Sequence, residues 1–368
     1  MRKVMRFMLG AALPLSLATA VQAAPAHAAF DCTTTSQDYE VVDLFDLSRG
    51  YAINEQGHVA GERQKNNDPA SPAQAAVWRD GKTIDLGYLF GGWLRGQPNS
   101  VATDIDDQDR VVGYSNNLDG NNHAFLWQNG FMRDLESWGN ESWALAIGGG
   151  VVGGWWRDPK DTGDLFQKQR SNVWEDGTSA VTPGGRGSEI VDMNANGDAT
   201  GNMGLSNASG PYASARDRAH RVFARINYDF RDIGTLGGKW SLAGGINDNG
   251  QVVGSSATDD LGLAHQGFIW DRQNGMRKLA GHDVEESAEE SAEPKAINNA
   301  GTVVGQYGCY AVSSPAVWQT PATPPVRLPR PANATQAWAE DLNERGDIVG
   351  WAQTSDGKIH AVVWRKKS

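Results

Sequence analysis

The sequence predicts an all-β protein, a seven-bladed β-propeller with four antiparallel strands in each blade. A ten-residue motif occurs seven times at spacings of 42 to 53 residues, and a second, tryptophan-containing motif alternates with it. No stretch shows a helical periodicity of any length. A repeat of about this period is typical of propeller blades. We therefore expect one domain over residues 29–368, with one blade for each copy.

The first motif predicts a strand, a turn and a second strand. Its apolar residue ends the first strand. The following Asn and Gly form the turn, because Asn hydrogen-bonds to local backbone and Gly takes positive φ without cost. The β-branched residues after the turn begin the second strand. The copies are AINEQGHVAG (52–61), DIDDQDRVVG (104–113), the shortened AIGGGVVGG (146–154), DMNANGDATG (192–201), GINDNGQVVG (245–254), AINNAGTVVG (296–305) and DLNERGDIVG (341–350).

The second motif predicts the third strand, and a tight turn such as 128–130 leads from it to a fourth strand. Its copies are AAVW (75–78), HAFLW (123–127), SNVW (171–174), QGFIW (266–270), PAVW (315–318) and HAVVW (360–364). A large aromatic residue that recurs in phase is expected to pack between neighbouring sheets. The tryptophans concerned are Trp78, Trp127, Trp174, Trp270, Trp318 and Trp364. In blade four, Phe223 is the residue nearest to this position.

The two ends of the chain complete each other. The last unit stops after its third strand, whereas residues 38–48 read as a fourth strand with no unit before them. We expect Val41 to Leu47 to pair with the strand around Ala361 to Trp364. This pairing would close the ring with the N-terminal strand and remove the open sheet edges.

Residues 1–28 have the features of a secretory signal peptide, with cleavage between residues 23 and 29. A basic start is followed by an apolar stretch over 7–21 and by small-x-small sites.

Loss of the three basic residues of the signal peptide would change the formal net charge from −11 to −14. Such an acidic protein is a poor ligand for nucleic acid. No later stretch reaches the roughly 20 apolar residues of a membrane span. We expect a secreted, extracellular monomer.

Cys32 and Cys309 are the only cysteines. Secretion favours a disulfide between them, and two free thiols are the alternative.

No sequence motif indicates an active site or a cofactor. The chain contains no HExxH, GxSxG or P-loop sequence, and we predict a protein that is not an enzyme. Carboxylate pairs contributed by different blades, as in a glycosidase or a lyase, are the alternative.

Two groups of residues raise the question of a metal site, and we predict none. The histidines at the start of the third strands should be distributed around the ring, too far apart to share an ion. They are His123, His220, His265 and His360. Four aspartates in the turn of blade two lack the glycine and the distal glutamate of a calcium loop. They are Asp104, Asp106, Asp107 and Asp109.

The connections from strand two to three and from strand four to the next blade are long, and all lie on one face, which we call the long-loop face. Binding residues usually lie on such loops. Four tryptophans in or beside these connections follow no repeat, and we predict that they bind a partner. They are Trp93, Trp138, Trp155 and Trp156. Trp143, Trp240 and Trp338 precede a first strand by similar distances, and either packing or binding would explain them.

The blocks HAFLWQNGFMRDL (123–135), DIGTLGG (232–238) and GINDNGQVVG (245–254) resemble the extracellular HAF repeat family of secreted bacterial proteins. The resemblance covers nearly the whole chain after the signal segment. It implies a secreted seven-bladed propeller that binds a thermolysin-type metalloprotease and promotes its autolysis, and that is a glutamine substrate of transglutaminase. Among glutamines in segments expected to be exposed, we predict Gln37, Gln64 and Gln74 as the reactive ones. A propeller that binds a polysaccharide is the alternative.

Overall fold

The computed structural model describes residues 34–367, except for 90–97, 119, 136–140, 159, 161–167, 176–177, 183, 205–219, 260–263, 283–289 and 310–311. The chain divides into two units, Met1–Phe30 and Asp31–Ser368. The predicted signal segment and Cys32 lie outside the described residues, so cleavage and the disulfide to Cys309 stay predictions. In the described part of the chain, no helix is long and apolar enough to span a membrane.

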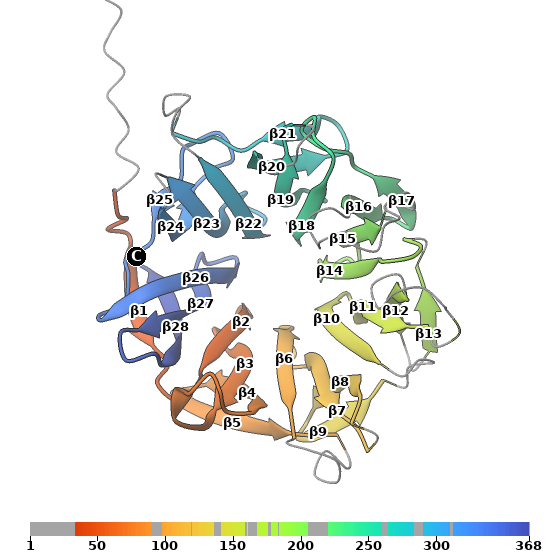
Figure 1. Ribbon diagram of the computed structural model, residues 1–368, viewed down its shortest axis with the longest axis vertical. Coiled ribbons are helices and arrows are strands. Elements are labelled where there is room, and N and C mark those ends of the chain that lie inside the picture. Colours follow the sequence, from red (N-terminus) through yellow and green to blue (C-terminus); the bar gives the residue numbers. More distant parts are fainter. Residues whose placement is uncertain are drawn as a thin grey trace, which may run out of the picture. The chain divides into compact units, whose positions relative to one another are not determined.

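Seven four-stranded antiparallel sheets form a ring in the second unit, as predicted (Figure 1). Blade one contains β2 (Arg49–Ile53), β3 (Val59–Gln64), β4 (Ala73–Arg79) and β5 (Lys82–Gly87). Blade two contains β6 (Ser100–Ile105), β7 (Val111–Asn116), β8 (Asn122–Gln128) and β9 (Phe131–Asp134). Blade three contains β10 (Ser142–Gly148), β11 (Val151–Arg157), β12 (Gln169–Glu175) and β13 (Thr178–Val181).

Blade four contains β14 (Glu189–Met193), β15 (Ala199–Gly204), β16 (His220–Ile226) and β17 (Asp229–Asp232). Blade five contains β18 (Ser241–Ile246), β19 (Val252–Ala257), β20 (His265–Asp271) and β21 (Gly275–Lys278). Blade six contains β22 (Ser291–Ile297), β23 (Val303–Cys309), β24 (Val312–Trp318) and β25 (Val326–Arg327). Blade seven contains β26 (Ala334–Leu342), β27 (Ile348–Thr354), β28 (Ile359–Lys366) and β1 (Tyr39–Asp43). A short 3-10 helix, Lys65–Asn67, lies between β3 and β4.

The N-terminal strand closes the ring, as the sequence predicts. In the β1–β28 pairing, Val41 lies opposite Trp364 and Val42 lies opposite Val363. The pairing continues beyond β1, because the N–H of Ala361 donates to the carbonyl oxygen of Leu47 at 2.9 Å. This closure leaves blade seven with four strands, like the other six blades.

The Asn of the first motif links neighbouring blades by hydrogen bonds. Its side-chain oxygen accepts backbone N–H groups of its own turn, and its amide nitrogen donates to the backbone oxygen of the equivalent residue in the next blade. Asn343 reaches Asn54 in this way across the closing junction, at 3.1 Å. Equivalent donors are Asn54, Asn194, Asn247 and Asn298. These bonds explain why the motif contains Asn rather than another turn residue.

Three aspartates of the innermost strands also connect successive blades. One oxygen of Asp341 accepts the N–H of Leu342 at 2.7 Å, and the other accepts the N–H of Ile53 in blade one at 2.9 Å. Asp104 and Asp192 make the same pair of bonds to blades three and five. Burial, first of all, raises the pKa of Asp341 to about 7, and the negative charge of nearby Asp192 adds to the shift. Burial likewise raises the pKa of Asp192 to about 6.

The core consists of apolar layers between adjacent sheets. One layer joins Val304 and Val317 of blade six to Ile348 and Val362 of blade seven. The recurring tryptophans belong to these layers, as expected, and Trp318 and Trp364 are fully buried.

In blade four the tryptophan position is occupied by Arg225 rather than Phe223, which corrects the sequence expectation. Arg225 lies opposite Ala199, as Trp270 lies opposite Val252. Phe223 is two residues earlier and occupies the position of Phe268.

Candidate functional site

Aromatic and charged side chains gather on the two inner strands of four consecutive blades: seven, one, two and three. They lie toward the ends of these strands nearest the long-loop face. At this level each blade presents a cross-strand pair, which is Trp338–Trp351, Arg49–Glu62, Val101–Tyr114 and Trp143–Trp155 in turn. We call Trp338, Trp351, Arg49, Tyr51, Tyr114, Trp143 and Trp155 the aromatic row. The row lies on β26 and β27, on β2, on β7, and on β10 and β11, and these four blades occupy one half of the ring (Figure 1).

In blade seven the two indole rings stack face to face. The centroids of Trp338 and Trp351 are 3.9 Å apart, with an interplanar angle of 15°. The indole N–H of Trp351 donates to the Glu340 carboxylate at 2.9 Å. The guanidinium of Arg49 in blade one lies over the Trp351 ring, 4.9 Å from its centroid, in the geometry of a cation–π contact. Both indole rings remain partly exposed.

A buried carboxylate lies at the middle of the row. Glu62 is only 4% exposed, and its ion pair with Arg49 offsets part of the burial that raises its pKa. Burial, and then the charge of Glu62, raise the pKa of Tyr114 to about 12. The same two causes, in the same order, raise the pKa of Tyr51. Both phenols therefore remain protonated hydrogen-bond donors throughout the physiological pH range.

Blade three ends the row. Tyr114 of blade two stacks on Trp143 with centroids 3.9 Å apart, and Trp143 stacks on Trp155 at 5.4 Å. Arg157 lies over Trp155 at 5.8 Å and forms an ion pair with Glu141. The indole N–H of Trp143 is buried and has no hydrogen-bond partner among the residues that the structure describes. The row therefore holds one donor that the fold leaves unused.

The equivalent positions of the other three blades serve the fold. In blade four, Asn202 donates to Glu189 at 3.0 Å, and in blade six Gln306 donates to the backbone oxygen of Ala337 at 3.2 Å. In blade five, Ser255 donates to the backbone oxygen of Ala292 at 3.0 Å. The cross-strand pairs of these blades at this level are Glu189–Asn202, Leu242–Ser255 and Glu293–Gln306, and none of them contains an aromatic residue. The blade geometry therefore does not require the aromatic residues of the other four blades.

Only half of the predicted tryptophan set can be placed. Trp93 and Trp138 lie outside the described residues. Trp155 belongs to the aromatic row but is only 8% exposed. Trp156 is partly buried, and its indole N–H has no hydrogen-bond partner. Trp143 and Trp338 occupy equivalent positions, whereas Trp240 precedes β18 and lies beside His265, with ring centroids 5.7 Å apart.

The predicted glutamines differ in exposure. Gln37 is exposed and lies just before β1. Gln64 is buried at the end of β3, and its amide donates to the backbone oxygens of Pro69 and Ser71. Gln74 lies within β4 and is partly buried. Gln64 and Gln74 therefore lie in strands, and the expectation that both are in exposed segments is wrong.

Two of the third-strand histidines pair with carboxylates. His123 lies 2.8 Å from Asp134, and His360 lies 3.3 Å from Asp43, each on the outer strand of the same blade. The backbone positions of His220 and His265 are one residue earlier in the register, so these two residues are not equivalent to His123 and His360.

The aspartates of blade two are held by separate partners. Asp106 binds Arg110, Asp107 accepts the N–H of Glu55, and Asp109 contacts His58 and Arg79. Among the residues that the structure describes, no group of three or more His, Cys, Asp or Glu side chains is arranged to hold a metal ion.

No protein-family model and no curated protein matches the sequence. Solved propeller structures do match the fold. The β-propeller domain of the Trilobed protease from Pyrococcus furiosus is 9% identical with a TM-score of 0.53, covering 90% of this chain and 97% of that one. The acylaminoacyl peptidase from Pyrococcus horikoshii is 10% identical with a TM-score of 0.51, covering 92% of this chain. The chain spans about half of that peptidase, 53% of its length. These likenesses establish the fold, and the chain is a seven-bladed β-propeller.

Proposed function

We propose that the protein is a secreted, non-enzymatic binding protein that holds a protein partner on the aromatic row. The observation that carries this proposal is the departure from sevenfold repetition at a single level of the blades. At that level blades four, five and six carry no aromatic residue, whereas blades seven, one, two and three present Trp, Tyr and Arg. These three residue types are the ones most enriched at the energetic centres of protein interfaces.

A rigid ring suits this task. The stacked and ion-paired side chains are already ordered in the free protein, so little rotamer entropy is lost on association. The partly exposed rings of Trp338, Trp351 and Trp143 supply apolar area, and Arg49 and Arg157 supply charge next to it.

We further propose that the partner is a thermolysin-type metalloprotease and that binding promotes its autolysis. The support for this step is the sequence resemblance to the HAF repeat family. A bound protein can shift a protease toward a cleavable conformation only by binding that conformation more tightly than the intact one. The propeller would then act by differential affinity and would need no catalytic residue of its own.

Loss of intact thermolysin during incubation with the purified propeller tests the proposal. The wild-type protein should accelerate the loss, and Trp338→Ala should weaken the effect about tenfold, as expected for an aromatic residue at an interface hot spot. Leu242→Ala is the matched control, because Leu242 occupies the equivalent position in blade five and is 42% exposed. If both variants act like the wild type, the aromatic row is not the binding surface. Cleavage of a polysaccharide by the purified protein would instead contradict the non-enzymatic assignment.

The role as a transglutaminase substrate is likewise proposed from the resemblance. The accessible glutamine among the three candidates is Gln37, which lies outside the regular strands.

A further inference from the structure

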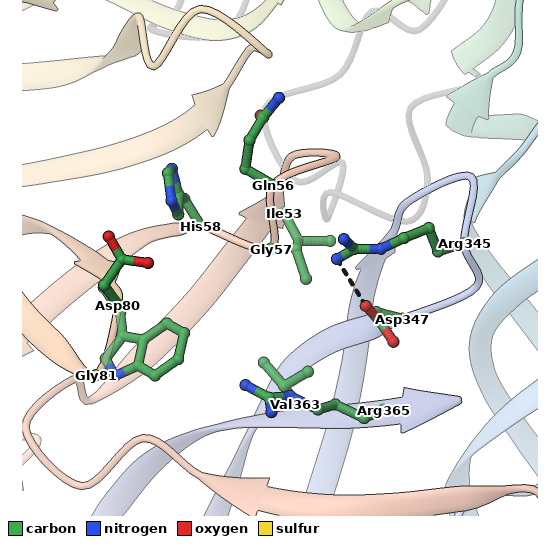
Figure 2. Close-up of a pocket in the computed structure, with 11 residues that line it drawn as sticks. Ile53, Gln56, Gly57, His58, Asp80, Gly81, Arg345, Asp347, Val363 and Arg365 are labelled. Atoms are coloured by element: carbon green, nitrogen blue, oxygen red, sulfur yellow. Dashed lines mark hydrogen bonds and ion pairs between the residues drawn. The ribbon is translucent and has the colours of Figure 1, made fainter. Parts of the chain in front are cut away.

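A pocket of about 600 Å³ lies at the junction of blades seven and one, on the opposite face from the long loops. The turn between β2 and β3 supplies Gln56 and His58, and the turn after β4 supplies Asp80. From blade seven come Arg345 and Arg365. Figure 2 shows Arg345 and Arg365 on the blade-seven side, and His58 and Asp80 on the blade-one side. The volume lies within the range of pockets that hold small molecules.

The way the ring closes explains why a pocket opens at this junction. In the other blades the fourth strand follows the third in sequence, whereas in blade seven β28 pairs with the N-terminal strand β1. The recurring tryptophans of blades six and seven are fully buried, and the indole N–H of Trp364 donates to Pro329 at 2.7 Å. Trp78, at the same position in blade one, is partly exposed and lines the pocket. One indole ring thus remains available to a ligand.

Some polar groups of the pocket already have an ion-pair partner, and others do not. Arg345 forms an ion pair with Asp347 at 2.9 Å, and His58 Nδ1 contacts Asp109 at 2.7 Å. Arg365 and Asp80 are exposed, and neither has a hydrogen-bond or ion-pair partner among the described residues. The free groups are therefore a guanidinium contributed by blade seven and a carboxylate contributed by blade one, and Trp78 of blade one adds an indole ring.

This arrangement selects for a specific ligand chemistry. A guanidinium matches a planar carboxylate through two parallel N–H bonds. A carboxylate such as Asp80 accepts hydrogen bonds from hydroxyl groups, and the amide of Gln56 can both donate and accept. A phosphate would bring more negative charge close to Asp80 and Asp347 than a single free arginine balances. The ligand that fits has one carboxylate, several hydroxyls and an apolar ring face.

We propose that this pocket binds a hexuronate, the pyranose unit of an acidic sugar. The carboxylate of the sugar pairs with Arg365, its hydroxyl groups donate to Asp80, and the C–H face of the ring lies on the indole of Trp78. The site is separate from the aromatic row, and it does not depend on the proposed protein partner.

Calorimetric titration of the full chain tests the proposal. The ligands are the sodium salts of glucuronate and galacturonate, compared with glucose and galactose, which differ from them only at C6. At least one hexuronate should bind, at least tenfold more tightly than its neutral counterpart. Arg365→Gln should remove that preference, because it deletes the charge on an exposed side chain without disturbing the core.

Two further variants distinguish a specific effect on the pocket from a general effect on the fold. Trp78→Leu should weaken hexuronate binding at least tenfold, whereas Trp127→Leu should leave it unchanged. Trp127 is the equivalent, partly exposed tryptophan of blade two and does not line this pocket. The proposal is overturned if neither hexuronate binds at 20 mM, if the neutral sugars bind equally well, or if Trp127→Leu is as damaging as Trp78→Leu.

Discussion

Replacing Asp341 by Asn should make the stability of the ring less dependent on pH. The pKa of Asp341 is raised from its ordinary value of 3.8 to about 7, mainly by burial. A carboxyl group whose pKa is raised on folding stabilises the native state most when it is protonated, below pH 4. That contribution is lost as the pH rises through about 7. Asn cannot ionise, so the stability of Asp341→Asn does not fall by this amount as the pH rises.

The size of the stability change follows from the pKa shift of Asp341. One pKa unit corresponds to about 1.4 kcal/mol, so the complete shift is equivalent to about 4 kcal/mol at high pH. The side chain is partly exposed at the ring centre, and water there screens its charge. Between pH 5 and pH 8 we therefore expect the wild type to lose about 1 to 2 kcal/mol relative to Asp341→Asn. Asn also offers only one acceptor to the N–H groups of Ile53 and Leu342, but this cost is the same at both pH values.

Urea unfolding at pH 5 and pH 8 measures the difference. Asp46→Asn is the control, because Asp46 is exposed and should leave the pH dependence of the wild type unchanged. If the free-energy difference between the wild type and Asp341→Asn is equal at the two pH values, or favours the wild type at pH 8, the assigned cause is wrong.

Three further predictions concern the ring and its termini. Deleting residues 34–48 should lower the melting temperature sharply, because it exposes the edge of β28, and adding the missing segment as a peptide should restore part of the loss. Asn194→Asp should cost about 1 to 3 kcal/mol in urea unfolding, because it removes the donor to the buried oxygen of Asn247, and an unchanged free energy would contradict the linking role. Transglutaminase-catalysed amine labelling should modify Gln37 and spare the buried Gln64, and the reverse pattern by peptide mass spectrometry would refute the exposure argument.

The strand order and the ring closure could be predicted because their signals are local and repeated. Asn54 and Gly57 form a turn through their own backbone preferences, and each copy of the motif repeats that information. The pairing of residues 38–48 with the last blade could be predicted from a count of strands alone. The blade-four tryptophan position was misassigned because the register of β16 against β15, which puts Arg225 opposite Ala199, depends on pairing between strands.

The aromatic row could not be predicted because it depends on contacts between strands and between blades. Trp351 is adjacent to Gly350 in sequence, but its partners are Trp338 across the sheet and Arg49 in the next blade. Tyr114 meets Trp143 only through the packing of blade two on blade three. One available signal was that Trp338 and Trp143 precede their first-motif copies by similar distances. The burial of Gln64 was missed because its amide folds back onto the following loop.

Hydrogen exchange of the propeller, alone and with inhibitor-blocked thermolysin, tests the central claim most directly. If the protease binds at the aromatic row, its addition should slow exchange in the inner strands of blades seven and three. These strands lie at 334–342, 348–354 and 142–157. The equivalent strands of blades four and five, at 189–204 and 241–257, should exchange at unchanged rates. Protection of all blades alike, or only of the turns on the opposite face, would contradict the claim that the aromatic row is the binding surface.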